Sequence, residues 1–282
     1  ALMTNLLAFK NFTDRFKLLI SKNPRLISIT LSNIFTMRLI GNKTHGDLAE
    51  IAIAEFINQF MYDFRSVHVG KDLFRAKEHE EDIEIINEIT KESFPVSLKA
   101  YGDGPLQLST DKSFQMFPAL QGYGTAINDK YAIQEILNHP AFSEFGKMNV
   151  LPLIYDEKSK RCNILVFDSL KARDSISSIR YEHEGNGRKH PVYRFYDTNK
   201  SYICEVRYGG TNANALQRGM WTHTKNARPF FDSITNGWID YAHNTVLVQL
   251  FSHALFTSLT GHKIALNEIK KDIETLKSEL TP

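Results

Sequence analysis

An acidic segment and a lysine-bearing segment soon after it hold the residues best suited to chemistry. Asp82 and Glu84 alternate with apolar residues in one, and Ser97 and Lys99 do so in the other. Alternation predicts two strands, with Asp82 on the face of Glu84 and Ser97 on the face of Lys99. If the strands pair, carboxylates and a lysine lie close together. Such a set can bind a divalent cation and orient a water molecule for attack on a phosphodiester. A solvated face with an ordinary cross-strand ion pair fits the same pattern.

A helix expected over about 45–63 supplies a further carboxylate. Glu50 falls on its apolar stripe, together with Ile53, Ala54, Ile57 and Met61. A buried carboxylate needs a compensating cation, so Glu50 is a candidate metal ligand, with a helix-edge residue reaching water as the alternative. Glu55 neighbours Asn58 and Gln59 and is expected on the surface.

Glu50, Asp82, Ser97 and Lys99 together resemble the active site of type II restriction endonucleases of the PD-(D/E)XK superfamily. In that family an acid opens one strand, a (D/E)-x-K tripeptide lies on the next, and a preceding helix often adds a glutamate. Asp82 matches the first acid and Lys99 the lysine. Ser97 stands where the family has its second acid, and Glu81 where it has proline. The resemblance covers residues 45–110, about a quarter of the chain.

This resemblance implies an α/β fold with a mixed central β-sheet flanked by helices, and Mg²⁺-dependent hydrolysis of duplex DNA. Asp82 would bind Mg²⁺ with Glu50 or Glu84, and Lys99 would orient the attacking water. Ser97 occupies the variant position of the motif. Gln107, just after the glycine turn, is a candidate phosphate contact, although packing at the core edge explains it equally well.

Two segments are candidates for reading DNA sequence. The first, around residues 208–224, is rich in amide side chains and offers Arg207, Asn212, Asn214, Gln217 and Arg218. Asparagine and glutamine pair with adenine, and arginine with guanine, in the major groove. A turn that caps a helix beginning near Asn212 is the alternative. The second segment, interpreted as a loop, offers Arg180, Asn186, Arg188 and Lys189; a solvated surface loop fits it as well.

Composition narrows the classes of function. Of the 282 residues 42% are hydrophobic and 23% charged, which is typical of a globular protein. The net charge of +2 means that any binding of nucleic acid must come from local basic patches. No apolar run approaches the ~20 residues of a membrane span, and no signal peptide is apparent, so a cytoplasmic protein is expected. Two separated cysteines predict buried thiols, and histidine spacing fits no zinc motif.

Helices are expected at both ends and strands in the middle, within one domain. Its parts are helices over 1–44, a catalytic core over 45–175, a DNA-recognition region over 176–240 and C-terminal helices over 241–282. Helices are predicted at 4–22, 24–39, 241–258 and 264–279, and the principal strands at 65–70, 81–88, 93–100, 148–155, 161–167, 191–197 and 202–208.

The sequence therefore predicts a Mg²⁺-dependent, sequence-specific endonuclease that acts on double-stranded DNA as a homodimer. The terminal helices are candidate dimer elements, although packing on their own core is an alternative. Two other functions fit the same residues. One is a repair, junction or modification-dependent nuclease of the same fold. The other is a non-catalytic DNA-binding protein with a degenerate nuclease core.

Overall fold

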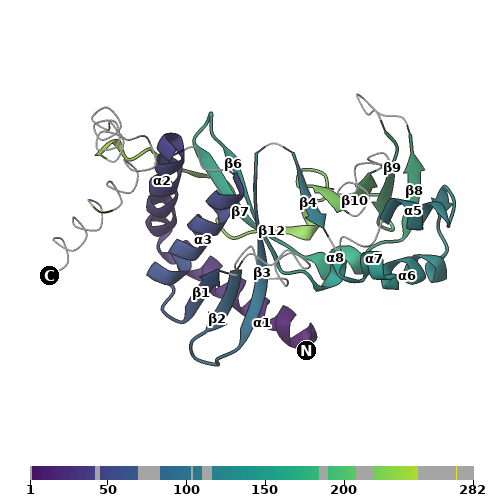
Figure 1. Cartoon of the computed structure of the whole chain (residues 1–282), viewed down its shortest axis with the longest axis horizontal. Coiled ribbons are helices and arrows are strands. Elements are labelled where there is room, and N and C mark those ends of the chain that lie inside the picture. The colour runs from purple at the N-terminus through teal and green to yellow at the C-terminus, as the bar shows by residue number, and fades with distance from the viewer. Residues whose placement is uncertain are drawn as a thin grey trace.

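The molecule has two β-sheets placed side by side, each with its own helices and its own apolar core (Figure 1). The computed structural model describes residues 2–41, 45–68, 83–102, 104–109, 116–183, 190–207, 219–246 and 271. The α/β fold with a mixed sheet flanked by helices is confirmed. A second sheet accompanies it, which the sequence did not predict.

The first sheet is mixed. Its strands, in spatial order, are β1 (Phe64–His68), β2 (Ile83–Asn87), β3 (Ser93–Tyr101), β6 (Val150–Asp156), β7 (Arg161–Phe167) and β12 (Phe231–Ser233), and β13 (Ile239–Asp240) also pairs with β7. Strands β3 and β6 run parallel, whereas the other neighbours are antiparallel. A parallel pair needs a long crossover connection, and the chain between β3 and β6 enters the second half of the molecule before it returns.

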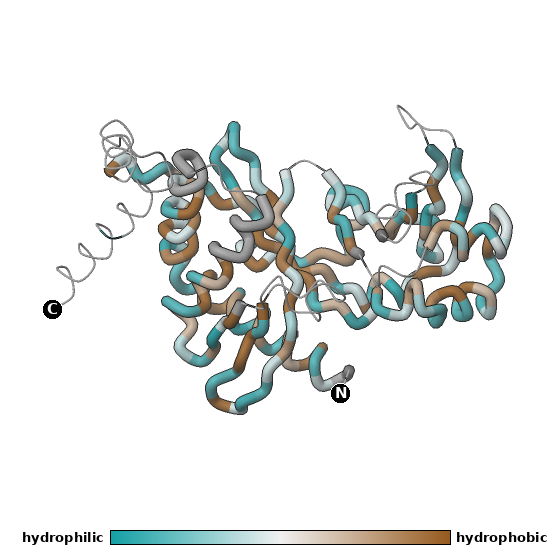
Figure 2. The backbone as a smooth tube through the Cα atoms, viewed as in Figure 1, coloured by the Kyte–Doolittle hydropathy of each residue, from teal (hydrophilic) through white to brown (hydrophobic). Residues whose placement is uncertain are grey.

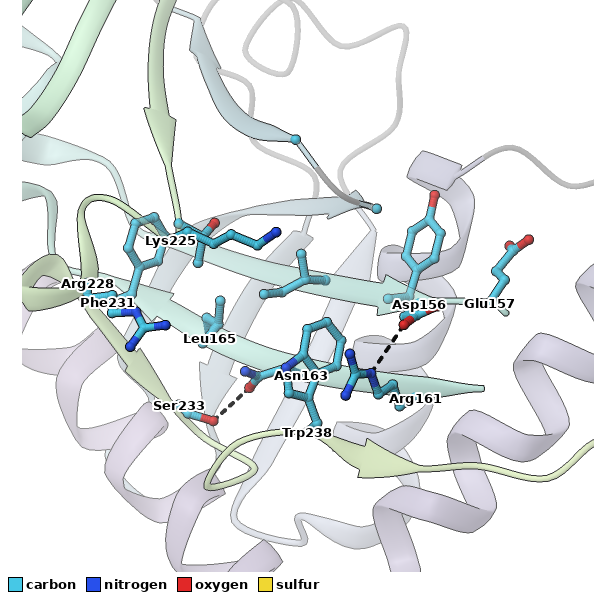
Figure 3. Close-up of a pocket in the computed structure, with 15 residues that line it drawn as sticks. Asp156, Glu157, Arg161, Asn163, Leu165, Lys225, Arg228, Phe231, Ser233 and Trp238 are labelled. Atoms are coloured by element: carbon cyan, nitrogen blue, oxygen red, sulfur yellow. Dashed lines mark hydrogen bonds and ion pairs between the residues drawn. The ribbon is translucent and has the colours of Figure 1, made fainter. Parts of the chain in front are cut away.

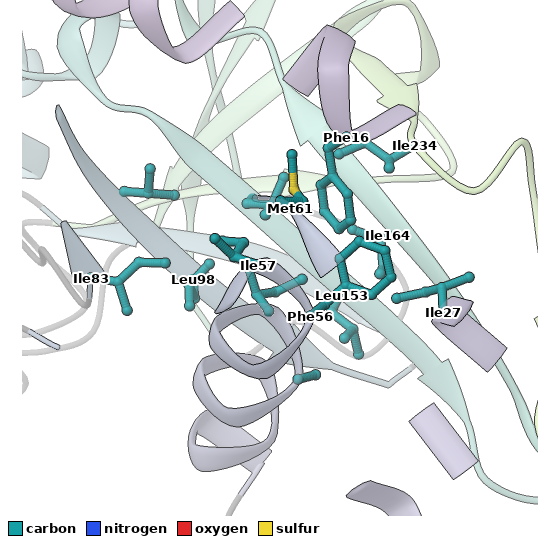
Figure 4. Close-up of a cluster of buried hydrophobic side chains, with 14 of the residues drawn as sticks. Phe16, Ile27, Phe56, Ile57, Met61, Ile83, Leu98, Leu153, Ile164 and Ile234 are labelled. Atoms are coloured by element: carbon teal, nitrogen blue, oxygen red, sulfur yellow. The ribbon is translucent and has the colours of Figure 1, made fainter. Parts of the chain in front are cut away.

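Three helices cover one face of this sheet: α1 (Leu2–Lys22), α2 (Pro24–Gly41) and α3 (His45–Phe60). Phe9, Phe12 and Phe16 recur at helical spacing on α1 and are buried together against the sheet. The ring of Phe12 meets that of Phe64 edge-on, with centroids 5.3 Å apart. Figure 4 shows this core, where side chains from α1 and α3 meet those of the strands, among them Phe16, Phe56, Leu98, Leu153 and Ile164.

The second sheet is antiparallel throughout. Its order is β4 (Pro105–Ser109), β11 (Gly219–His223), β10 (Tyr202–Arg207), β9 (Val192–Tyr196), β8 (Ser178–Glu182) and β5 (Ala126–Ile127). The apolar core of this sheet also contains residues from four helices and two 3₁₀ turns. These are α5 (Met116–Gln121), α6 (Lys130–Asn138), α7 (Pro140–Ser143), α8 (Ser169–Asp174), η1 (Phe145–Lys147) and η2 (Arg228–Phe230). Hydrophobic residues lie along the strands of both sheets (Figure 2), and β6 and β7 of the first sheet are buried at most of their positions.

Most of the principal strands lie where alternation predicted them, but one segment was misassigned. Arg180 belongs to β8 and not to a loop, because Ile179 and Tyr181 on either side of it point into the second core. The expected buried thiols are confirmed, since Cys162 and Cys204 are buried and unbonded to each other. Residues 247–270 and 272–282, which include most of the predicted terminal helices, lie outside the described residues.

Of the helices that the structure describes, none combines the length and the apolar character needed to cross a bilayer.

Candidate functional site

Lys99 lies on a β-hairpin whose two strands pair as the sequence predicted. Strands β2 and β3 are antiparallel, with Ile83 opposite Val96 and Glu84 opposite Pro95. Ile83, Val96 and Leu98 are buried against the helices. Because successive side chains alternate faces, Glu84, Ser97 and Lys99 share the other face, which is turned away from those helices.

On this shared face Glu84 is closer to Ser97 than to Lys99. Its partner Pro95 precedes Lys99 by four residues, a distance of about 13 Å along a strand. Glu84 and Lys99 are both half-buried, whereas Ser97 is only 5% exposed. Glu84 can therefore share a ligand with Ser97 more readily than with Lys99, and a second carboxylate near Lys99 must come from another part of the chain.

Lys99 lines a cavity between the two sheets. The cavity has a volume of about 320 Å³ and is lined by Lys99, Ala100 and Tyr101 of β3, Pro105, Leu106 and Gln107 of β4, and Trp221 of β11. The structure thus brings together Lys99 and Gln107, two residues singled out by the sequence. Strand β3 lies in the first sheet and β4 in the second, so the short connection between them sets this arrangement.

Polar residues form a cross-strand row on the open face of the second sheet. Cross-strand partners link Gln107 to Trp221, Trp221 to Glu205, Glu205 to Arg194, and Arg194 to Arg180. Their apolar neighbours, such as Leu106, Met220 and Phe195, point to the other side and fill the core. Arg207 follows Glu205 by two residues and shares its face. Three candidate DNA contacts, Gln107, Arg180 and Arg207, therefore lie on one surface.

Glu205 is the centre of this face, and its side chain is only 2% exposed. Its Oε1 lies 2.7 Å from Nε2 of His223 and 3.2 Å from a terminal nitrogen of Arg207, and Oε2 lies 3.7 Å from Nε of Arg194. Burial alone would raise the pKa of Glu205. The hydrogen bond from His223 and the charge of Arg207 outweigh burial and lower the pKa to about 2.

A ring contact and a second ion pair hold the two arginines beside Glu205 in place. The Arg207 guanidinium stacks on the ring of Trp221, with its carbon 4.4 Å from the centroid. Arg194 reaches Glu182 at 3.1 Å as well as Glu205. Arg180, in contrast, is exposed and forms no ion pair within the part of the chain that the structure describes. On this face, therefore, contacts with neighbouring side chains hold the guanidinium groups of Arg194 and Arg207, whereas that of Arg180 extends into solvent.

A second, larger cavity of about 870 Å³ lies over the first sheet (Figure 3). The Oη of Tyr101, which lines the smaller cavity, lies 2.6 Å from Oγ1 of Thr224, which lines the larger one. Burial raises the pKa of Tyr101 to about 12, so its phenol stays neutral near pH 7. This hydrogen bond marks the boundary between the two cavities.

Several predicted site residues lie outside the described residues: Asp82, Asn186, Arg188, Lys189, Asn212, Asn214, Gln217 and Arg218. Glu50 belongs to α3, but its side chain is not among those described. Glu55 is exposed, as expected, and accepts a hydrogen bond from Gln59. Among the described residues, no three of the types His, Cys, Asp and Glu are grouped to hold a metal ion.

Reasoning from the sequence missed the buried polar cluster around Glu205. The one available signal was a glutamate inside the apolar stretch Ile203-Cys204-Glu205-Val206, where a charged residue needs a partner. The identity of that partner was hidden, because His223 and Arg194 come from neighbouring strands.

Comparisons of the chain with known protein families, with curated proteins and with solved structures find no match. The chemistry of the residues around Lys99 and Glu205 therefore carries the functional proposal.

Proposed function

We propose that the protein is a Mg²⁺-dependent endonuclease that cuts double-stranded DNA at specific sequences. One observation carries this proposal: Lys99, on a paired β-hairpin of a mixed sheet, shares a cavity with Gln107 and Trp221 of a second sheet that carries arginines. A cation beside an arginine-bearing face suits a polyanionic substrate.

The donor atoms on the face of Lys99 suit a hard cation. Glu84 and Ser97 offer carboxylate and hydroxyl oxygens, which are ligand types that Mg²⁺ accepts. In this proposal Asp82 completes the set; Glu50, the other candidate ligand, belongs to α3, which covers the opposite face of the sheet. When bound, Mg²⁺ would lower the pKa of a coordinated water and neutralise charge on the scissile phosphate.

The residues of the chain have separate roles in the proposed reaction. Lys99 orients the attacking water and stabilises the negative charge that develops on the phosphate. Gln107, on β4 of the second sheet, donates to a phosphate oxygen and fixes the position of the DNA backbone. Arg180 and Arg207 contact the duplex from the open face of the second sheet. The amide-rich segment with Asn212, Asn214, Gln217 and Arg218 reads bases in this proposal. The segment with Asn186, Arg188 and Lys189 does so as well.

The expected assembly is a homodimer in the cytoplasm. A two-fold axis would match a palindromic site and supply one active centre for each strand.

The decisive experiment is cleavage of unmethylated phage DNA with Mg²⁺ by the wild type and by Lys99→Gln and Asp82→Asn. We expect discrete bands from the wild type and a loss of at least ~10²-fold in rate for each variant. Lys91→Gln is the matched control, because Lys91 lies at the exposed turn of the same hairpin. Bands that survive both active-site substitutions would refute the assignment of this hairpin.

A non-catalytic DNA-binding protein is the second candidate. It is favoured by the buried Ser97 at the motif position of an acid. Specific DNA binding without cleavage, equal in the wild type and Lys99→Gln, would establish it. Cleavage confined to junctions, lesions or modified bases would instead identify another nuclease of the same fold.

A further inference from the structure

The larger cavity contains a fixed polar group at its floor. Asn163 of β7 is 9% exposed and lines this cavity. Its Oδ1 accepts a hydrogen bond from the Ser233 hydroxyl at 2.7 Å and lies 3.1 Å from the Thr235 hydroxyl. Ser233 in turn accepts the backbone N–H of Gly237 at 2.7 Å, so its own proton is directed to Asn163.

This network determines which end of the Asn163 amide is available. With its oxygen engaged by the Ser233 hydroxyl, the amide presents its nitrogen to the cavity, as Figure 3 shows. That nitrogen makes no hydrogen bond to any part of the chain that the structure describes. The nitrogen faces the cavity, where it can donate to water, and a ligand acceptor can take the place of that water. Because the oxygen is engaged, Asn163 cannot make the paired contact that asparagine makes with adenine, and a base carbonyl suits it better.

The walls and the rim add aromatic surface and positive charge. Trp238 is 43% exposed, and the guanidinium carbon of Arg161 lies over its ring, 4.6 Å from the centroid. Phe231 lies on the side of the cavity where Lys225 and Arg228 extend (Figure 3). The acidic residues of the rim lie on the opposite side, where Asp156 is paired with Arg161 at 3.2 Å. The cavity therefore combines a donor at its floor, flat apolar surface and two cations at one side. Its volume falls in the usual range of about 300–1,000 Å³ for sites that bind small molecules.

We propose that this cavity binds a nucleotide, with a base carbonyl oxygen on the amide nitrogen of Asn163 and the phosphate on Lys225 and Arg228. The choice of a nucleotide among flat anions rests on the proposed function, since the cavity adjoins the one that holds Lys99. The nucleotide is either free in solution or an unpaired nucleotide of bound DNA.

Tryptophan fluorescence tests this site without any cleavage assay. The chain has two tryptophans, and Trp221→Phe leaves Trp238 as the only reporter. This substitution also removes a buried indole N–H that has no hydrogen-bond partner among the described residues. Thymidine 5′-phosphate should quench or shift the emission of Trp238 saturably, and deoxyadenosine 5′-phosphate should bind more weakly.

Substitutions test which residues contact the base and which contact the phosphate. In this background, Asn163→Asp and Lys225→Ala with Arg228→Ala should each weaken binding of thymidine 5′-phosphate about tenfold or more, as expected for losing a hydrogen bond or charge contact. Lys130→Ala, on the exposed surface of α6, is the matched control and should bind as the background protein does. Equal binding by Asn163→Asp, or equal affinity for both nucleotides, would overturn the role of Asn163.

The source of the nucleotide is identified by competition. Displacement of thymidine 5′-phosphate by a duplex with one mismatched thymine, but not by the fully paired duplex, would identify an unpaired nucleotide of DNA. Binding that no DNA displaces would identify a free nucleotide. No response to the nucleotide or to either duplex would refute the site. Because Lys99→Gln should bind thymidine 5′-phosphate normally, failure of the nuclease proposal and failure of this site are distinguishable.

Discussion

His223 Nε2 lies 2.7 Å from Oε1 of Glu205, at the centre of the polar face of the second sheet. The same nitrogen lies 3.2 Å from a terminal nitrogen of Arg207, which can only donate. Because the carboxylate can only accept, the shorter contact requires a proton on Nε2, which Nε2 donates to Glu205; the contact with Arg207 is then a close approach of two donors and not a hydrogen bond. The pair therefore joins β11 to β10 by a charge-assisted hydrogen bond that also holds the charge beside Arg207.

Removing the charge of Glu205 should destabilise the fold. In Glu205→Gln, Arg207 and Arg194 lose their buried counter-charge, and we expect the free energy of unfolding to fall by about 3 kcal/mol. Chemical denaturation near pH 7 measures this change. Glu55→Gln is the control, because Glu55 is exposed on α3, far from this cluster in the chain, and should contribute less than about 1 kcal/mol. Equal losses in both variants would contradict a special role for burial.

The stabilising effect of Glu205 should depend on pH. The pKa of Glu205 in the folded protein is lowered from 4.5 to about 2, so its contribution is complete above pH 4.5 and is lost as the pH falls toward 2. We expect the wild type to be more stable than Glu205→Gln by about 3 kcal/mol at pH 7, and the difference to vanish near pH 2. Denaturation curves at pH 7, 4.5 and 2.5 would show this. A difference that stays constant over this range would assign the effect to packing instead.

The hydrogen bond between Tyr101 and Thr224 should contribute measurable coupling between the two halves of the molecule. Tyr101→Phe and Thr224→Val each remove one hydroxyl, and the double variant removes both. We expect a coupling free energy of about 1 kcal/mol in the double-mutant cycle, measured by chemical denaturation. Additive losses would show that the two hydroxyls do not stabilise each other.

Arg180 should contribute to DNA affinity without contributing to stability. Its side chain is exposed on the row that also holds Gln107, so Arg180→Gln should leave the unfolding midpoint unchanged. Under the nuclease proposal, the variant should bind duplex DNA more weakly, with the slope of log K against log salt less negative by about 0.9. Binding titrations over a range of salt concentrations test this. Lys130→Gln, on α6, should leave both affinity and slope as in the wild type.

Local patterns in the sequence were sufficient to predict the hairpin but not the cavity beside it. Alternation of apolar residues around Glu84 and Lys99 predicted both strands and the shared faces, because burial on one side enforces a period of two. The cavity that joins Lys99 to Gln107 could not be predicted, since it depends on β3 and β4 lying in different sheets. The strand that holds Arg180 is not predictable from the pattern, because charged neighbours obscure the alternation of Ile179 and Tyr181.

The open face of the second sheet has a consequence for redesign of the protein. Gln107, Arg180 and Arg207 project from backbone whose alternate side chains already fill the core. The chemistry of Gln107 and Arg180 can therefore be exchanged with little repacking, so a library confined to these two positions could vary ligand preference on a constant scaffold. Arg207 and Glu205 are the exceptions on this surface, because they form an ion pair. Both should be kept in any such library, since a variant that lacks either one would leave a charge of the buried cluster without its partner.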